Sequence, residues 1–252
     1  MSAFLSYEKP VLTVMLQCET PEVAGGRIEK ALPLGAEAFG LQVESLKKEY
    51  QNSGTYQELF AKMQGRPVYV TNYRGKTNEG KSDEELAEGL LVLAESGATL
   101  CDVMGDYFCR HPEELTDDPE AVKKQMELIQ KLHERGAEVL MSSHVLKYTP
   151  AERVLEIALE QQRRGADIVK IVTGAENMEQ QLENLRITHL LKENLKVPFL
   201  FLSGGTCELH RRIGGNLGCC MYLCVYEHDE FSTKAQPLLT DIKAIRDHMM
   251  GQ

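Results

Sequence analysis

Apolar segments of strand length alternate with amphipathic segments of helical period along the chain. The apolar segments are rich in Val, Leu, Ile and Phe, and they predict eight strands, at residues 11–18, 38–44, 67–73, 99–105, 138–145, 167–173, 198–203 and 219–226. The amphipathic segments predict helices, among them 83–96, 119–135, 150–164, 178–194 and 237–249. Prolines near the starts of these helices and glycines near their ends agree with the assignment.

Eight strands, each followed by a helix, in 252 residues predict a closed (β/α)8 barrel, the TIM barrel fold, rather than an open doubly wound sheet. Because no change of composition marks a boundary, we expect one domain over residues 1–252. The longest connection after a strand, residues 106–118, is long for a structureless loop in a compact domain. It is either a functional lid or a surface excursion.

Composition narrows the possible partners. The chain is 42% hydrophobic and 26% charged, as is typical of a globular protein with a sizeable core. Its net charge of −10 is spread along the helices, which argues against nucleic acid as a partner. Residues 1–10 lack the apolar region of a signal peptide, and no apolar run is long enough to span a membrane. We therefore expect a cytoplasmic protein without a membrane partner.

The seven cysteines are odd in number and lie mostly in apolar segments, without the paired CxxC motifs of a zinc site. The densest group is Cys219, Cys220 and Cys224. We interpret these residues as small core side chains rather than a metal or redox site.

Lys170 is the strongest candidate for chemistry. In a barrel the active site lies at the carboxyl ends of the strands, and Lys170 lies within the apolar sequence Ile-Val-Lys-Ile-Val of residues 168–172. A desolvated lysine amine can attack a carbonyl group to form a Schiff base. The alternative is a structural lysine paired with a carboxylate of the barrel.

His144 ends the predicted strand before that of Lys170, so the two side chains are expected to converge on one small ligand. An imidazole titrates near neutral pH and suits general acid and base catalysis, although a histidine at a strand end is often structural. Arg74 and Glu79 lie in a charged loop after strand three, which is alternatively a solvated surface loop. Arg211 and Arg212 follow strand seven, where an arginine near a helix start suits an anionic substrate.

Two of these segments carry a resemblance to a known family. Gly-Ala-Asp-Ile-Val-Lys-Ile at 165–171, preceded by Met-Ser-Ser-His at 141–144, resembles the type I 3-dehydroquinate dehydratases of the shikimate pathway. The resemblance implies a hydro-lyase that removes water from 3-dehydroquinate by syn elimination, through a lysine imine, to give 3-dehydroshikimate. It also implies that no metal or organic cofactor takes part.

The resemblance further implies roles for individual residues. Lys170 is the imine nucleophile, His144 the general base and acid, and Glu79 the carboxylate that orients the histidine. The resemblance gives the substrate-binding residues as Arg74, Arg212, Ser232 and Gln236. We add Gln42, which lies in the altered strand two. Ser232 and Gln236 belong to the sequence Ser-Thr-Lys-Ala-Gln, which stands where the family has a mobile Ser-Ala-Pro-Gly-Gln loop.

The sequence departs from the family in its substrate-binding positions. The Glu-Trp-Arg-x-Asp signature of strand two is replaced by Gly-Leu-Gln-Val-Glu at 40–44, so Gln42 and Glu44 either replace the missing groups or serve another ligand. After strand seven, the family arginine matches either Arg211 or Arg212.

Three functions remain open at this point. The first is the dehydratase, acting on 3-dehydroquinate or a related polyhydroxy keto acid. The second is a Schiff-base class I aldolase acting on a keto acid or sugar phosphate, with a phosphate site near Gly204 and Gly205. The third is a non-catalytic barrel that binds a metabolite. For the enzyme we expect a small anionic substrate and a possible homodimer.

Overall fold

The computed structural model describes residues 4–250. Its strands are β1 Val11–Leu16, β2 Ala38–Gln42, β3 Val68–Thr71, β4 Leu100–Met104, β5 Glu138–His144, β6 Ile168–Gly174, β7 Phe199–Gly204 and β8 Met221–Cys224. Its α-helices are α1 Pro21–Ala31, α2 Ser53–Lys62, α3 Asp83–Glu95, α4 Pro119–Glu134, α5 Ala151–Arg163, α6 Met178–Asn194, α7 Leu209–Leu217 and α8 Leu239–Met249. Four short 3-10 helices lie in the connections: η1 Leu32–Leu34, η2 Val43–Ser45, η3 Lys48–Tyr50 and η4 Lys76–Asn78.

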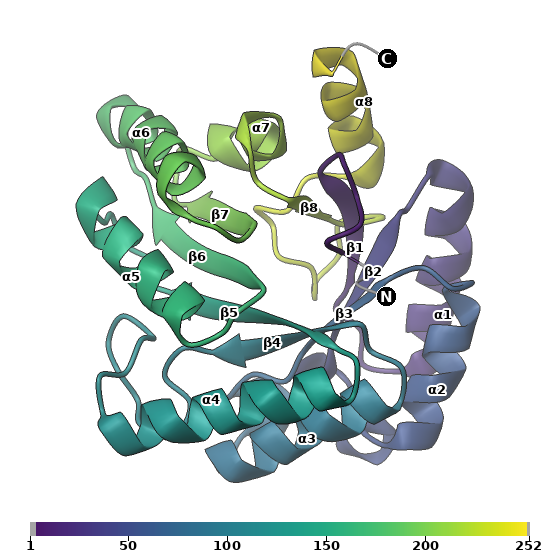
Figure 1. The fold of residues 1–252 in the computed structure, drawn as a ribbon. Helices are drawn as coiled ribbons and strands as arrows, with labels where there is room; N and C mark the ends of the chain where they lie inside the picture. Colours follow the sequence, from purple (N-terminus) through teal and green to yellow (C-terminus); the bar gives the residue numbers. More distant parts are fainter. Residues whose placement is uncertain (1–3, 251–252) are drawn as a thin grey trace.

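The strands form one parallel sheet in the order β7-β6-β5-β4-β3-β2-β1-β8, and the helices surround it (Figure 1). The ladder is continuous except between β7 and β8. There the amide of Cys220, just before β8, donates to the carbonyl oxygen of Phe199 at 2.9 Å. The strands therefore form a nearly closed barrel, and the predicted (β/α)8 fold is confirmed.

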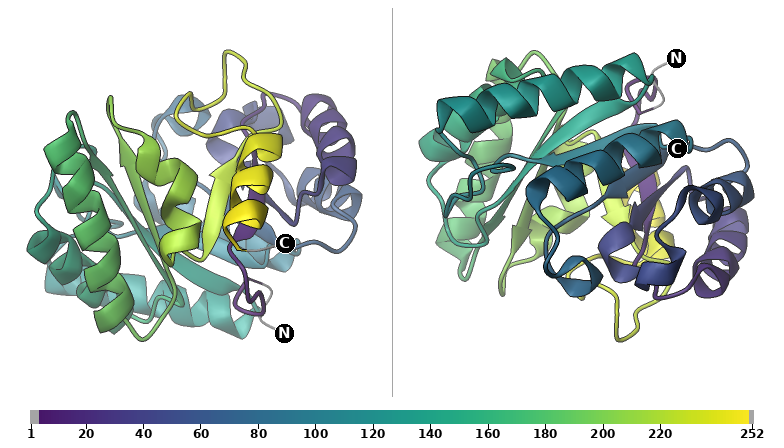
Figure 2. Two further views of the ribbon diagram at one scale, coloured as in Figure 1. Left: turned by 90° about the horizontal axis from the view of Figure 1, so that it is seen from above. Right: turned by 90° about the horizontal axis from the view of Figure 1, so that it is seen from below.

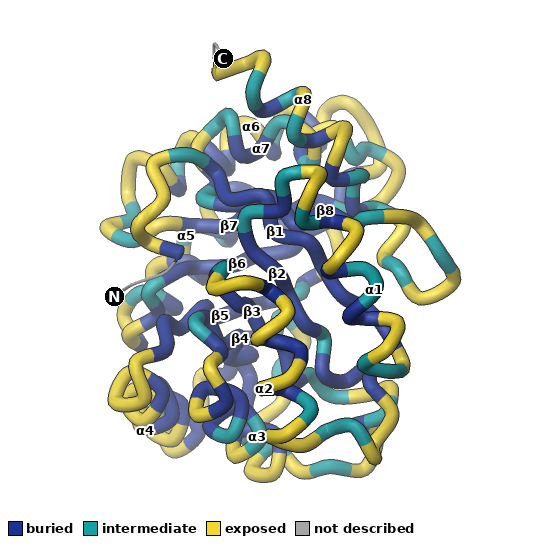
Figure 3. The backbone as a smooth tube through the Cα atoms, turned by 90° about the vertical axis from the view of Figure 1, so that its right-hand side faces the viewer, coloured by how far each residue is buried: buried dark blue, intermediate teal, exposed yellow. Residues whose placement is uncertain are grey.

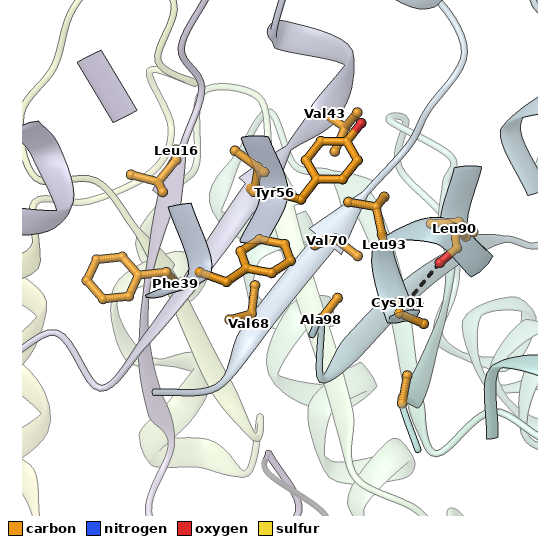
Figure 4. Packing of buried hydrophobic residues seen from close by; sticks show 14 of the residues in the cluster. Leu16, Phe39, Val43, Tyr56, Val68, Val70, Leu90, Leu93, Ala98 and Cys101 are labelled. Atoms are coloured by element: carbon orange, nitrogen blue, oxygen red, sulfur yellow. Dashed lines mark hydrogen bonds between the residues drawn. The ribbon is translucent and has the colours of Figure 1, made fainter. Parts of the chain in front are cut away.

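The strands are buried on both faces, whereas the outer sides of the helices are exposed (Figure 3). Side chains on the outer face of the barrel pack against the helices. Figure 4 shows Phe39, Val68 and Val70 of β2 and β3 beside Tyr56 of α2 and Leu93 of α3. Removing this apolar surface from water, at about 25 cal/mol per Å2, is the main favourable term that holds the helices on the barrel.

Inside the barrel, side-chain volume decides which residues fit. A Cβ atom added to Gly40 of β2 would lie 2.3 Å from the sulfur of Met15 and 3.0 Å from the ring of Tyr69. Both neighbours are buried. Glycine is required at position 40 because these side chains from β1 and β3 occupy the space that its own side chain would need.

Two long connections lie at the carboxyl ends of the strands. Residues 105–118 join β4 to α4, and residues 225–238 join β8 to α8. The second projects beyond the strand ends in both views of Figure 2. It is attached to the barrel by Thr233, whose amide donates to Gln17 at 2.7 Å, and by an ion pair between Arg27 and Asp229.

The seven cysteines are free thiols. Cys219 and Cys224 are buried and Cys220 is partly buried, which agrees with their interpretation as core residues. Within residues 4–250, no helix is long and apolar enough to cross a membrane. The same residues include no group of three His, Cys, Asp or Glu side chains arranged to hold a metal ion.

Candidate active site

Lys170 lies in the middle of β6 with its side chain inside the barrel, and only 4% of the residue is exposed. Its Nζ atom lies 2.8 Å from the hydroxyl of Tyr73, 3.0 Å from that of Tyr69 and 3.1 Å from Oδ2 of Asp102. The three partners come from β3, from the residues just after it and from β4. Lys170 therefore pairs with a carboxylate of the barrel, as the structural alternative predicted. It also lies inside the barrel, as expected of a nucleophile.

Asp102 is fully buried and is the centre of this polar cluster. Besides Lys170, it accepts hydrogen bonds from the hydroxyls of Tyr69 and Tyr73 and, at 2.5 Å, from that of Ser142 on β5. Four donors offset the cost of burying a carboxylate. Burial first, and then the charge of Asp102, raises the pKa of both tyrosines well above its usual range, so both hydroxyls are protonated at neutral pH.

His144 is the last residue of β5, one strand away from Lys170. Ser142 lies opposite Lys170 in the parallel ladder, so His144 lies two residues closer to the barrel mouth. Tyr73 links the two: its ring meets that of His144 edge to face at 5.2 Å between centroids, while its hydroxyl bonds to Lys170. Lys170 and His144 thus both contact Tyr73.

The carboxylate beside His144 is Glu114, not Glu79. Glu114 accepts a hydrogen bond from Nδ1 of His144 at 2.7 Å and one from its backbone amide at 2.8 Å. Burial raises the pKa of Glu114, but the bonds from His144 outweigh this effect and hold it below its usual value. Glu79 is exposed in the β3–α3 connection. The pairing expected for Glu79 is therefore corrected: a residue of the long 105–118 connection holds this place.

Arg74 anchors that connection. Its guanidinium forms two hydrogen bonds of 2.7 Å to the carboxylate of Asp83 at the start of α3. A third bond of 2.7 Å reaches the carboxylate of Asp106, and a fourth of 2.9 Å reaches the carbonyl oxygen of the same residue. Four of its five N–H groups are thus used within the protein. Arg74, which was expected to bind substrate, therefore uses its donors in this arrangement to hold the loop.

Of the two arginines after β7, the structure places Arg211 against the strand end. Its Nε donates to the carbonyl oxygen of Ser203 at 2.6 Å, and burial lowers the pKa of its guanidinium. Arg212 is exposed. The two side chains diverge because consecutive residues of a helix point about 100° apart. Arg211, and not Arg212, therefore contacts the end of β7.

The remaining expected binding residues lie along the β1–β2 and β8–α8 sides of the mouth. Gln42 accepts from Gln17 at 3.0 Å and from Lys76 at 3.4 Å. Ser232 is engaged with Asp229 inside its own turn. Gln236 is buried, and its amide oxygen has no hydrogen-bond partner among the described residues. An unsatisfied buried acceptor of this kind calls for a donor from a ligand or from water.

Comparison with known proteins identifies the family of this chain. The sequence profile of the family described as Type I 3-dehydroquinase matches residues 12–249. The chain belongs to this family. It is 34% identical over 92 residues to a 3-dehydroquinate dehydratase of Alkaliphilus oremlandii, and this match covers 36% of each chain. It is 30% identical over 169 residues to the enzyme of that name from Syntrophotalea carbinolica, covering 63% of this chain and 61% of the relative.

The chain thus spans less than two thirds of either of these curated relatives. Among solved structures, the 3-dehydroquinate dehydratase of Geobacillus kaustophilus superposes with a TM-score of 0.82 at 16% identity, covering 96% of this chain and 92% of that one. This likeness supports the barrel fold over the length of the chain.

Within the type I 3-dehydroquinase family, the altered strand two now has a physical explanation. The signature glutamate would stand at Gly40, where Met15 and Tyr69 leave no room for a side chain. Tyr69 in turn bonds to Asp102 and Lys170. The space that a substrate-binding side chain would need is filled by the protein itself.

Sequence reasoning missed the two tyrosines and Glu114. Period-two alternation puts residues 69, 71 and 73 on one face of the strand, and this pattern is the available signal that the two tyrosines act together. Asp102 is a charged residue within an apolar strand segment, and this position is a comparable signal. Glu114 had no such signal, because it lies in a connection without regular structure.

Proposed function

We propose that this chain is a hydro-lyase that converts 3-dehydroquinate to 3-dehydroshikimate by syn elimination of water through a Schiff base on Lys170. The observation that carries the proposal is that Lys170 and His144 both contact Tyr73, in a member of this family. The substrate class extends to closely related polyhydroxy keto acids. The reaction needs no metal or organic cofactor.

The chemistry follows from the two side chains. The amine of Lys170 adds to the ketone, and loss of water gives an iminium ion that acidifies the neighbouring C–H bond. His144 removes that proton. The resulting imidazolium then protonates the β-hydroxyl, which leaves as water, and hydrolysis of the imine releases the enone product and the free lysine.

Glu114 would fix the histidine for both proton transfers. Because its carboxylate accepts from Nδ1, the neutral ring carries its proton there and leaves Nε2 as the base. The negative charge of Glu114 also stabilises the imidazolium that forms between the two transfers. We assign to Glu114 the role that the family resemblance gave to Glu79.

Arg211 and Gln236 are the residues we propose for the substrate carboxylate and a substrate hydroxyl. Arg211 is a cation beside the end of β7, with one of its donors bonded to Ser203. Gln236 offers a buried acceptor that lacks a partner among the described residues. Gln42 and Ser232 border the same mouth and complete the proposed binding set.

The aldolase alternative has less support. A phosphate site after β7 would need free backbone N–H groups near Gly204 and Gly205. There the carboxylate of Glu176 accepts from the amide of Thr206 at 3.2 Å, and a Cβ on Gly205 would lie 2.5 Å from Oε1 of Glu176. An anionic side chain in this position repels a phosphate group.

Borohydride trapping tests the proposal. The protein is incubated with 3-dehydroquinate and borohydride, and the adduct is located by intact mass and peptide mapping while absorbance follows the enone. We expect one reduced adduct on Lys170 and none with Lys170→Ala. Product without an adduct on Lys170 would exclude the Schiff base, and an adduct without product would leave a non-catalytic or differently specific barrel.

A matched pair tests the carboxylate site. Arg211→Gln is expected to raise KM by about 10-fold to 150-fold, because a charged hydrogen bond is worth about 1.5–3 kcal/mol. The neighbouring Arg212→Gln should leave KM within about twofold, as expected of an exposed residue. A larger effect from Arg212 would reverse the assignment.

We further propose that residues 1–252 act as one domain, in the cytoplasm, as a homodimer. An exposed apolar row on α6 supports pairing: Met178, Leu182 and Leu185 are 64%, 59% and 37% exposed and lie on one side of the helix. Light scattering coupled to size-exclusion chromatography measures the assembly. A Leu182→Lys variant should be monomeric if this row is the contact.

A further inference from the structure

We propose that Tyr73 is a catalytic residue that carries the protons of imine formation at Lys170, a task separate from the C–H chemistry of His144. This inference deepens the proposed function and rests on Lys170 as the nucleophile. The hydroxyl of Tyr73 lies 2.8 Å from Nζ of Lys170 and also donates to Asp102. It therefore touches the atom that reacts.

Position distinguishes Tyr73 from Tyr69. Both hydroxyls contact Lys170 and Asp102, but Tyr69 is completely buried in the barrel interior, beneath the mouth. Tyr73 lies past the end of β3, is partly exposed, and packs its ring against His144. A ketone that approaches Lys170 from the mouth meets Tyr73 before Tyr69. Tyr69 is accordingly a positioning residue for the lysine.

The geometry also supplies a place for each proton. The lysine amine must lose a proton before it attacks, and Asp102 is the acceptor within 3.1 Å of Nζ. As the C–N bond forms, the π electrons of the carbonyl move to oxygen, which takes the proton of the Tyr73 hydroxyl. The nitrogen, now positively charged, returns a proton to the Tyr73 oxygen, and a neutral carbinolamine results.

The second half uses the same contacts. Tyr73 protonates the carbinolamine hydroxyl, the C–O bond breaks, water leaves, and the nitrogen lone pair forms the C=N bond. Asp102 then returns its proton to Tyr73 through their hydrogen bond. An ammonium ion and a ketone thus become a protonated imine and one water, with no net uptake of protons. His144 remains free for the elimination that follows.

The test separates imine formation from elimination. Enzyme in excess is mixed with 3-dehydroquinate, the reaction is stopped with borohydride at increasing times, and the adduct on Lys170 is measured by mass. Tyr73→Phe is expected to slow adduct formation by about 10²-fold to 10⁴-fold, the usual contribution of a positioned acid or base. His144→Ala should form the substrate adduct at nearly the normal rate but give no enone.

Tyr69→Phe is the matched control, because it removes the same two hydrogen bonds from the same lysine and aspartate. We expect adduct formation to be at least about 10-fold faster in Tyr69→Phe than in Tyr73→Phe, because Tyr69 positions the lysine but transfers no proton to the reacting ketone. Tyr73→His retains a group that donates and accepts protons, and its rate should exceed that of Tyr73→Phe. If Tyr73→Phe does not fold, Tyr73→His against Tyr73→Asn makes the same comparison.

Glyoxylate serves as a second carbonyl probe in the same trap. Adduct formation with glyoxylate but not with 3-dehydroquinate would overturn the proposed substrate. The role of Tyr73 would then still be tested, because the rates of adduct formation of the Tyr73 variants can be measured with glyoxylate. Equal slowing by Tyr73→Phe and Tyr69→Phe, or slowing by neither, would overturn the role of Tyr73. Absence of any adduct in the unmodified protein would overturn both proposals.

Discussion

Glu114 offers the sharpest test of the catalytic arrangement, because the structure and the family resemblance assign its task to different residues. We consider Glu114→Gln, which retains the size of the side chain and an oxygen acceptor for Nδ1 of His144 but removes the negative charge. The carboxylate accepts two hydrogen bonds from His144, at 2.7 and 2.8 Å. Its side chain is 28% exposed, so solvent screens the pair only in part.

The size of the effect follows from the charge. A hydrogen bond to a charged group is worth about 1.5–3 kcal/mol, and most of this is realised when His144 becomes an imidazolium. Loss of that stabilisation lowers kcat by about 10-fold to 150-fold. KM should change little, because Glu114 contacts the histidine rather than the substrate binding set.

The assay is steady-state enone absorbance with 3-dehydroquinate, with Glu79→Gln as the matched control. Glu79 is exposed, so its substitution should alter kcat by no more than about twofold. Borohydride trapping on Lys170 should persist in Glu114→Gln, which separates this defect from loss of the nucleophile. The reasoning is refuted if Glu114→Gln retains normal kcat or if Glu79→Gln shows the larger loss.

Three further outcomes are expected. Gly40→Ala should destabilise the fold by about 1–3 kcal/mol in urea unfolding, because a Cβ at this position would overlap its neighbours in the barrel. Gly26→Ala in α1 should be neutral or stabilising, because a Cβ there enters open space. Hydrogen bonds outweigh burial and lower the pKa of Glu114 and Asp83. These carboxylates bind fewer protons in the folded than in the unfolded protein. Their contribution to the stability of the fold is therefore present above about pH 4 and is lost as the pH falls through the lowered pKa values. The urea midpoint measured against pH checks this. Cys109, which is exposed, should react first with a thiol reagent in the native state; labelling of all seven cysteines at one rate would contradict the described burial.

The barrel could be predicted from local patterns because each strand and helix carries its own periodicity. Helix α6 has the predicted bounds, Met178–Asn194, and the other predicted helices differ by one or two residues at an end. The last strand is shorter than expected, Met221–Cys224, because residues beyond it leave the ladder and only Val225 forms a bridge, to Leu238. Strand ends depend on pairing partners, which local pattern does not specify.

The sequence by itself determined the order of the elements and the residues that share a face with Lys170, since alternation along a strand is a property of the strand alone. It also placed His144 on the neighbouring strand. Tertiary structure decided which carboxylate meets that histidine. Glu114 reaches it from a connection without periodicity, and the path of such a segment depends on distant contacts, such as those of Arg74 with Asp106.

Tertiary structure likewise decided which of two adjacent arginines contacts the end of β7, because a difference of one residue on a helix turns a side chain from the strand end to solvent. It also brought Tyr73 to Lys170, across 97 residues of sequence. That contact arises only when the curved sheet brings β3 and β6 to face each other across the barrel interior. Closure of the barrel, and not any local motif, is what assembles the polar cluster around the lysine.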